Sequence, residues 1–509
     1  MPKPTQVLTL PTPAFLGLNK GKQQVPQDPS WCIEAQNAVI DGAGRLACRK
    51  GRDGLTGSAV GSGAAIKEVF EFLQTDGTSI IISTQATKLY DGTTTLTDKT
   101  GALTPTAGRW NFVNFNGKCY AWQKSHTAIT KTTTGNWATL VAATGSLPAG
   151  DCAVAAFGRI WASDSDKQII KYCALLDATK WDAADGAGQI DMRQVWTHGM
   201  DEVVAITSYA AGLVVFGKRH VIIWVDGSGS TIGLDPTTMY VGQTIEGVGC
   251  IARDSVQLIG ELDIFFWSDS GIRSLQRTIQ EKATPINEIT HNIRDFLSAA
   301  RATADTDAVR SVYNPNDGFY LLIVPDSGVT IYVDTKQRLE DGSCKVTEWP
   351  SFTPSAACQT VAGVTHFGGS GIIERYFGFD DNGSSYRFAY RMPWNSLQGD
   401  NALKYLKEVG AVMLAPADTS IVFKWWTDFK SNVHTVTKTV SGGAFAEYNA
   451  DALYSVAEYS GDITVKDLRV WVETGSEFKY ISFGVEVDIN GFPFAIQSAS
   501  IVARAGRVA

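Results

Sequence analysis

The sequence predicts an all-β protein: a six- or seven-bladed β-propeller with an N-terminal extended arm and a C-terminal antiparallel β-domain. Three observations favour this fold class. The 509 residues include 49 glycines, 14 Trp, 16 Tyr and 23 Phe, with only 19% charged residues, a composition typical of short strands joined by tight turns. Paired apolar runs recur along the middle of the chain. Beyond about residue 395 the runs become longer and alternate more regularly between apolar and polar residues.

The propeller prediction rests on the repeated pairs of apolar runs. In each pair, a run rich in β-branched and aromatic residues meets a glycine-containing turn, and a second run follows; Trp110–Phe115, for example, leads through Asn116-Gly117 into Lys118–Trp122. Asn-Gly and Asp-Gly between such runs are strong signals of β-hairpins. Seven units of roughly forty to fifty residues match the period of propeller blades. Because the units share a pattern but no residues, six and seven blades both fit. Unrelated meanders or stacked sandwiches are the competing interpretation.

The changes in pattern divide the chain into three parts. Residues 1–62 have little strand periodicity and are expected to form an arm and docking segment. Residues 63–392 form the propeller, and residues 393–509 form the C-terminal domain. Inside the propeller, one amphipathic helix is expected at about 285–300, with Thr284 as its cap and Pro285 at its first position. Its apolar face is formed by Ile286, Ile289, Ile293, Phe296 and Ala300.

The charge and the cysteines restrict the function classes. The formal net charge is −8, whereas proteins that grip nucleic acid need a surplus of Lys and Arg to displace counterions. Tight DNA binding is therefore disfavoured. The eight cysteines lack the spacing of zinc or redox motifs, so buried free thiols are expected. The longest apolar candidate, 212–225, contains Lys218, Arg219 and His220, so no membrane-spanning segment is expected.

Local motifs for catalysis, cofactors or metals are lacking, so the sequence predicts a protein that is not an enzyme and has no cofactor. No histidine lies three or four residues from another histidine or a cysteine. Asp380 and Asp381 precede Asn382-Gly383, where a calcium site and a plain turn are the two interpretations. A glycan-binding or glycan-hydrolysing propeller is the alternative function, because the paired carboxylates of a glycosidase can come from distant parts of a sequence.

Three stretches, taken in order, resemble the hub or nozzle proteins of short-tailed bacteriophages, also called tail tubular protein B or packaged-DNA stabilisation proteins. The resemblance covers roughly residues 15–390. The stretches are Gly17–Asn19 with Glu34–Ala38, Ile40-Asp41, Gly44–Leu46 and Arg49–Gly51; then Gly247–Cys250 with Asp254–Val256 and Ile264–Ile272; and last the expected helix with Tyr313-Asn314, Gly318–Leu322, Val333-Asp334 and Glu348-Trp349.

This resemblance implies a structural virion protein of the tail that is made in the host bacterial cytoplasm. It implies a homo-hexamer that lies below the portal and adaptor proteins, retains packaged DNA and forms part of the ejection channel. Genomic DNA would pass without sequence-specific binding, and tail fibre or spike proteins are further candidate partners. An acidic conduit would repel the phosphates and let DNA slide.

One basic cluster stands out near the N-terminus. It consists of Arg45, Arg49, Lys50 and Arg52, and we call it the N-terminal basic cluster. A contact with a neighbouring subunit or with the adaptor is the functional hypothesis for these four residues. An ordinary solvated turn is the alternative, and the sequence supports the two equally.

Overall fold

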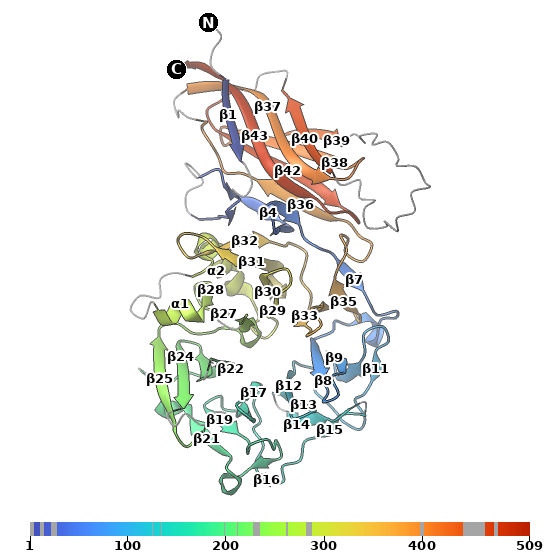
Figure 1. Cartoon of the computed structure of the whole chain (residues 1–509), viewed down its shortest axis with the longest axis vertical. Coiled ribbons are helices and arrows are strands. Elements are labelled where there is room, and N and C mark those ends of the chain that lie inside the picture. Colours follow the sequence, from blue (N-terminus) through green and yellow to red (C-terminus); the bar gives the residue numbers. More distant parts are fainter. Residues whose placement is uncertain are drawn as a thin grey trace.

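The computed structural model describes residues 5–10, 15–21, 28–124, 126–133, 135–197, 199–210, 212–226, 235–260, 263–280, 288–397, 402–440, 464–472 and 477–508. Strands dominate, and they form two bodies: a ring of small sheets and a sandwich of long strands at one side of the ring (Figure 1). The all-β propeller with a further β-domain, predicted from the sequence, is thus the observed fold.

Seven small antiparallel sheets, counted among the described residues, make the ring. Neighbouring blades contact one another through their innermost strands, except that the innermost strand of blade 4 meets the helical turn that leads into blade 5. The innermost strands of the first and last blades are also in contact, so the ring is closed. From innermost to outermost strand, the blades are: blade 1, β8 (Glu68–Leu73), β9 (Ser79–Gln85), β10 (Lys88–Asp91) and β11 (Thr97–Asp98); blade 2, β12 (Asn111–Phe115), β13 (Lys118–Gln123), β14 (His126–Lys131) and β15 (Ala138–Thr139); blade 3, β17 (Ala153–Ala156), β18 (Arg159–Ser163), β19 (Ile169–Tyr172) and β21 (Gly188–Asp191); blade 4, β22 (Val203–Tyr209), β23 (Gly212–Gly217), β24 (His220–Asp226) and β25 (Met239–Glu246); blade 5, β26 (Gln257–Ile259), β27 (Asp263–Trp267) and β28 (Ile272–Ser274); blade 6, β29 (Arg310–Asn314), β30 (Phe319–Val324), β31 (Val329–Arg338) and β32 (Cys344–Glu348); blade 7, β33 (Ala356–Gln359), β34 (Thr365–Gly368), β35 (Ile373–Tyr376) and β7 (Arg52–Gly54).

The segment with the Asn116-Gly117 signal forms the predicted β-hairpin. Phe115 pairs with Lys118 across the Asn116-Gly117 turn, and both turn residues have positive φ, at 45° and 70°. A two-residue hairpin turn with this backbone twist requires positive φ at both positions, which Asn and Gly tolerate best. The sequence therefore determines locally where the first two strands of blade 2 end and begin.

Short elements connect the blades. Two small parallel pairs lie beside them, and most of the helical turns precede or follow a blade strand. These elements are β16 (Thr144–Gly145) with β20 (Lys180–Trp181), β2 (Gly17–Leu18) with β3 (Trp31–Cys32), η1 (Gly61–Gly63), η2 (Ala183–Asp185), η3 (Met192–Gln194), η4 (Arg253–Ser255), η5 (His291–Ile293), η6 (Pro325–Ser327), α1 (Leu275–Gln280) and α2 (Arg294–Thr303).

The expected helix is shorter than its apolar pattern suggests. α2 begins at Arg294, and η5 precedes it, so the helix covers only the second half of the range 285–300. Ile293 and Ala300 are buried, whereas Phe296 is only partly buried. Thr284, Pro285 and Ile286 lie outside the described residues.

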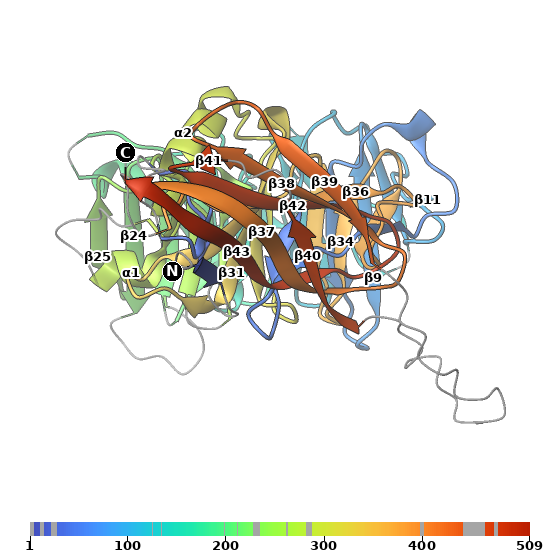
Figure 2. The ribbon, with the colours of Figure 1, turned by 90° about the horizontal axis from the view of Figure 1, so that it is seen from above.

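The second body is a sandwich of two sheets packed face to face around one apolar core. In Figure 2, which is seen from above, its long strands cross the end of the molecule. One sheet has the order β40 (Thr464–Trp471), β37 (Ala402–Ala415), β43 (Ala495–Val508), β6 (Leu46–Cys48) and β5 (Ala38–Ile40), with β1 (Thr5–Leu10) on β43 and β41 (Glu477–Phe478) on β37; the other has β4 (Glu34–Gln36), β36 (Tyr386–Arg391), β42 (Ile481–Ile489), β38 (Ser420–Thr427) and β39 (His434–Thr439).

The sandwich is not divided from the propeller where the sequence suggested. β36 pairs with β42 along its whole length, so 386–391 belongs to the sandwich and not to the propeller that was expected to extend to residue 392. β4 pairs with β32 of blade 6 on one side and with β36 on the other. One nine-stranded sheet therefore runs from blade 6 into the sandwich.

The N-terminal segment is likewise built into both bodies. β1, β5 and β6 pair within the sandwich, and β7 adds the outermost strand to blade 7. An early strand thus closes a ring whose other blades come later in the chain, which leaves no gap between the first and last blades. The described parts of residues 1–62 form strands within the fold, in contrast to the extended arm that weak periodicity suggested.

Gly51 marks the close crossing between this segment and the chain after β35. A Cβ at this position would lie 1.7 Å from the backbone oxygen of Asp380, and Gly51 N–H donates to the oxygen of Gly378 at 3.0 Å. We expect Gly51→Ala to lower the free energy of unfolding by about 1–3 kcal/mol, because the backbones must separate. Urea unfolding followed by Trp fluorescence measures this. Gly57→Ala is the control, since its Cβ would meet its nearest atom at 3.8 Å; equal effects of the two changes would contradict the crossing argument.

Candidate functional site

The N-terminal basic cluster lies where blade 7, blade 6 and the sandwich meet, and each of its cations has an acidic partner in the same chain. Arg45 pairs with Asp41 at 2.6 Å, and Lys50 with Asp317 at 2.9 Å. Arg52 lies 3.3 Å from Glu374. Arg49 pairs with Asp381.

Arg49 is the centre of this joint. Its guanidinium donates to both carboxylate oxygens of Asp381, at 2.9 and 2.7 Å, and to Asn37 Oδ1 at 2.8 Å. The group also lies 4.0 Å from the ring centroid of Tyr386. With its side chain 1% exposed, Arg49 cannot reach a neighbouring subunit, so the contact hypothesis is wrong for this residue. Arg45, Lys50 and Arg52 keep exposed fractions of 31%, 42% and 22%, so the contact hypothesis stays a prediction for these three.

The same geometry decides between the two interpretations of the Asp380-Asp381 pair. Asp381 binds Arg49, and Asp380 Oδ1 accepts the N–H of Gly383 at 2.6 Å in the turn. The two carboxylates serve a joint and a turn. Among the described residues, no group of three or more His, Cys, Asp or Glu side chains is arranged to hold a metal ion.

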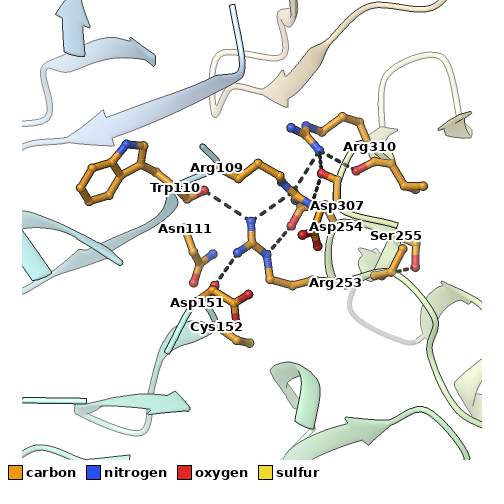
Figure 3. Close-up of polar contacts among 12 residues, drawn as sticks. Arg109, Trp110, Asn111, Asp151, Cys152, Arg253, Asp254, Ser255, Asp307 and Arg310 are labelled. Atoms are coloured by element: carbon orange, nitrogen blue, oxygen red, sulfur yellow. Dashed lines mark hydrogen bonds and ion pairs between the residues drawn. The ribbon is translucent and has the colours of Figure 1, made fainter. Parts of the chain in front are cut away.

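A second charged cluster, which the sequence analysis missed, lies at the centre of the propeller (Figure 3). We call it the central arginine cluster. It consists of Arg109, which precedes blade 2, Arg253 and Asp254 in η4, which precedes blade 5, Arg310 at the start of blade 6, and Glu68 at the start of blade 1.

Its ion pairs join blades across the ring. Asp254 contacts Arg109 directly and lies 2.7 Å from Arg253 Nε. Arg310 lies 3.9 Å from Asp254 and 3.4 Å from Glu68, and Arg109 lies 3.2 Å from Glu68.

Backbone carbonyl groups complete the cluster. Arg253 donates to the backbone oxygens of Asp151 and Trp110, which lead into blades 3 and 2. Arg310 donates to the backbone oxygen of Asp307 at 2.8 Å and of Lys67 at 3.0 Å. Five of the seven blades are therefore connected through one polar cluster.

The cluster is short of negative charge. Three guanidinium groups share the two carboxylates of Glu68 and Asp254. Burial, together with the nearby guanidinium groups of Arg253 and Arg310, lowers the pKa of Arg109 to about 9. A lowered arginine pKa means that this environment disfavours the charged form.

The central arginine cluster lies between two cavities on the propeller axis. One cavity, of about 250 Å³, is lined by the innermost strands and includes Phe70, Phe112 and Ser311. The other, of about 500 Å³, lies where the chain enters those strands, and we call it the mouth cavity. Arg253 lines both cavities, so the cluster forms a floor between them.

A positional signal could have revealed this cluster from the sequence. In six blades of the described ring, a charged residue stands at the start of the innermost strand or within the four residues before it: Glu68, Arg109, Asp151, Glu202, Arg253 and Arg310. Each residue looks like an ordinary loop charge in isolation. Only the repeated position predicts that the six charges meet at one end of the ring.

The cysteines agree with the expectation of buried free thiols. All eight cysteines are free, and seven of them are buried. Burial raises the pKa of the Cys48, Cys173 and Cys250 thiols to about 11. Within the described part of the chain, no helix is long and apolar enough to cross a membrane.

The chain resembles solved structures only weakly. No family model and no curated protein matches the chain. The WD40 β-propeller domain of Doa1 is similar with a TM-score of 0.40 and 11% identity, over 64% of this chain and 96% of that domain. Kluyveromyces lactis Hsv2 is similar with a TM-score of 0.32 and 9% identity, over 53% of this chain and 81% of that chain. TmCBM61, solved in complex with β-1,4-galactotriose, has a TM-score of 0.16 and 12% identity, over 28% of this chain and 70% of that chain. The assignment as a propeller rests on the strand pairing itself.

Proposed function

We propose that the chain is a structural subunit of a phage tail hub or nozzle, a homo-hexameric ring below the portal and adaptor that retains packaged DNA and forms part of the ejection channel. It acts without catalysis or a cofactor. In this proposal the protein is located in the virion tail and is synthesised in the host bacterial cytoplasm. Tail fibre or spike proteins are further candidate partners.

The observation that carries this proposal is the spatial meeting of the three stretches on which the resemblance to tail hubs rests. Asn37 N–H donates to the backbone oxygen of Glu348 at 2.8 Å, and Trp349 Nε1 donates to that of Ala38 at 2.9 Å, which joins the first stretch to the third. Tyr320 Oη donates to the backbone oxygen of Ser255 at 2.8 Å, which joins the third to the second. The stretches thus form one structural unit of blades 5 and 6 and the sandwich joint.

The mechanical properties of the fold support a role as a building block. A closed ring has few free sheet edges, and the shared nine-stranded sheet ties the sandwich to blade 6. Such a body transmits force without internal sliding. Identical copies of it can close into a cyclic ring through one repeated contact.

The proposal places DNA between subunits and not through a single propeller. The central arginine cluster lies across the propeller axis, with ion pairs from blade 2 to blade 5. Double-stranded DNA therefore needs a lumen formed by several chains. The formal net charge of −8 favours passage without tight binding, because acidic surfaces repel phosphates.

Mass measurement in solution tests this function. We expect the purified chain to be monomeric and to become six copies per complex when the portal–adaptor assembly is added, as read by light scattering after size exclusion. The competing glycan function predicts a chain that needs no ring. Polysaccharide degradation by the purified chain that disappears on replacing a single Asp or Glu would overturn the proposal.

A further inference from the structure

The mouth cavity is more basic than a chain of net charge −8 leads one to expect. Its lining includes five basic side chains and three acidic ones; the basic residues are Arg109, Lys124, Lys167, Lys218 and Arg253, and the acidic ones are Asp151, Glu202 and Asp307. These side chains come from segments before the innermost strands and from turns between the second and third strands of the blades. Several blades thus direct cations to one cavity, which is partly open to solvent.

The acidic residues of the lining do not balance these cations. Lys167 lies 3.4 Å from Asp151, and Lys218 lies 2.5 Å from Glu202. Among the described residues, Lys124 has no carboxylate within 4.0 Å. Arg109 and Arg310 bond to Asp307 only at its backbone oxygen. Below the cavity, the three guanidinium groups of Arg109, Arg253 and Arg310 share the two carboxylates of Asp254 and Glu68, which leaves one positive charge in excess.

Burial strengthens the effect of this imbalance. The side chains of Arg109 and Arg253 are only 14% and 13% exposed, so water screens their charge weakly. The rim of the cavity is formed by Lys124, Lys167 and Lys218, which are more exposed than these two arginines. Each ammonium group offers three N–H donors that can turn toward a ligand. The floor supplies a fixed positive field, and the rim supplies adaptable donors.

We propose that the mouth cavity is a binding site for a small oxyanionic ligand, one that carries a phosphate, sulfate or carboxylate group. The side chains of Lys124, Lys167 and Lys218 would bond to the oxyanion, and Arg109 and Arg253 would attract it from below. A volume of about 500 Å³ lies in the range of small-molecule pockets. The confined space and the acidic chain as a whole select a small anion over a nucleic acid.

Thermal unfolding with added sodium phosphate is the first test. Because a ligand that binds only the folded state stabilises it, we expect phosphate to raise the melting temperature in a saturable way, beyond sodium chloride at equal ionic strength. Glucose 6-phosphate and glucuronate distinguish a phosphorylated from a carboxylated ligand by which of them binds more tightly. Neutral glucose should have no effect.

Two variants with opposite expected effects make the test specific. The double change Lys124→Gln and Lys218→Gln removes two exposed rim charges and should weaken binding of the tightest anion about fivefold or more, as expected for partly screened charges. Asp307→Asn removes an acidic lining charge while leaving the backbone oxygen that Arg310 uses, and should tighten binding. If chloride protects as well as phosphate, or if both variants respond like the unchanged protein, the mouth cavity is not an anion site.

Discussion

Replacing Arg49 by Met is expected to lower the free energy of unfolding by about 3–5 kcal/mol, because the carboxylate of Asp381, only 14% exposed, loses its bidentate partner and keeps only the more distant guanidinium of Arg52 at 4.0 Å. Arg49 also holds Asn37 of the sandwich segment and lies against Tyr386. The loss therefore falls on the joint between the two bodies. The midpoint of urea unfolding, followed by Trp fluorescence at an unchanged slope, measures it.

The control for this prediction is Arg45→Met. The Arg45–Asp41 pair is 31% and 20% exposed, so its loss should cost less than about 1 kcal/mol. The double change Arg49→Met with Asp381→Asn removes both charges, and a large part of the stability should return. A cost for Arg49→Met no greater than that for Arg45→Met would show that Arg49 is not the centre of the joint.

Replacing Asp254 by Asn is expected to have a similar effect, about 3–5 kcal/mol, at the centre of the propeller. Asp254 is the shared partner of Arg109 and Arg253, and Arg310 is 3.9 Å away. When Asp254 has lost its charge, Glu68 is the carboxylate left to balance three guanidinium groups in the cluster. Repulsion among Arg109, Arg253 and Arg310 then opposes closure of the ring, which urea unfolding and limited proteolysis of the blades detect.

Two comparisons isolate the charge effect at Asp254. Glu202→Gln breaks an exposed pair, in which Lys218 is 58% and Glu202 38% exposed, and should be nearly neutral. Arg109→Met should reduce the cost of Asp254→Asn, because it removes one of the repelling cations. Strictly additive effects of these two changes would mean that Asp254 does not act through the arginines.

The fold was predictable where local residues determine it. The Asn116-Gly117 turn and similar turns specify hairpins through backbone conformation alone, and their recurrence indicates a propeller. The closure of blade 7 was not predictable in this way, because Arg52–Gly54 is short and polar and becomes a strand only by pairing with β35. Similarly, Tyr386–Arg391 has the same alternation whether it ends a blade or begins the sandwich.

The site residues illustrate the same division. The four cations of the N-terminal basic cluster are close in sequence, and proximity suggested a surface patch. Only Arg45 has a local partner, Asp41. The other three pair with distant residues, as in the case of Asp381, which lies 332 positions after Arg49. Conversely, Arg109, Arg253 and Arg310 are far apart in sequence and meet only because the ring brings the starts of its innermost strands together. Long-range pairing decides both outcomes. A single local stretch does not reveal it, and for the central arginine cluster only the repeated position of charges before the innermost strands indicates it.

The most direct test of the central claim is an electron-microscopic image of the assembled particle that contains this chain. The proposed function predicts a sixfold ring of propeller-and-sandwich subunits in the tail below the portal and adaptor, with DNA in the lumen between subunits and not within a propeller. A particle in which the chain forms no sixfold ring around the DNA path would contradict it.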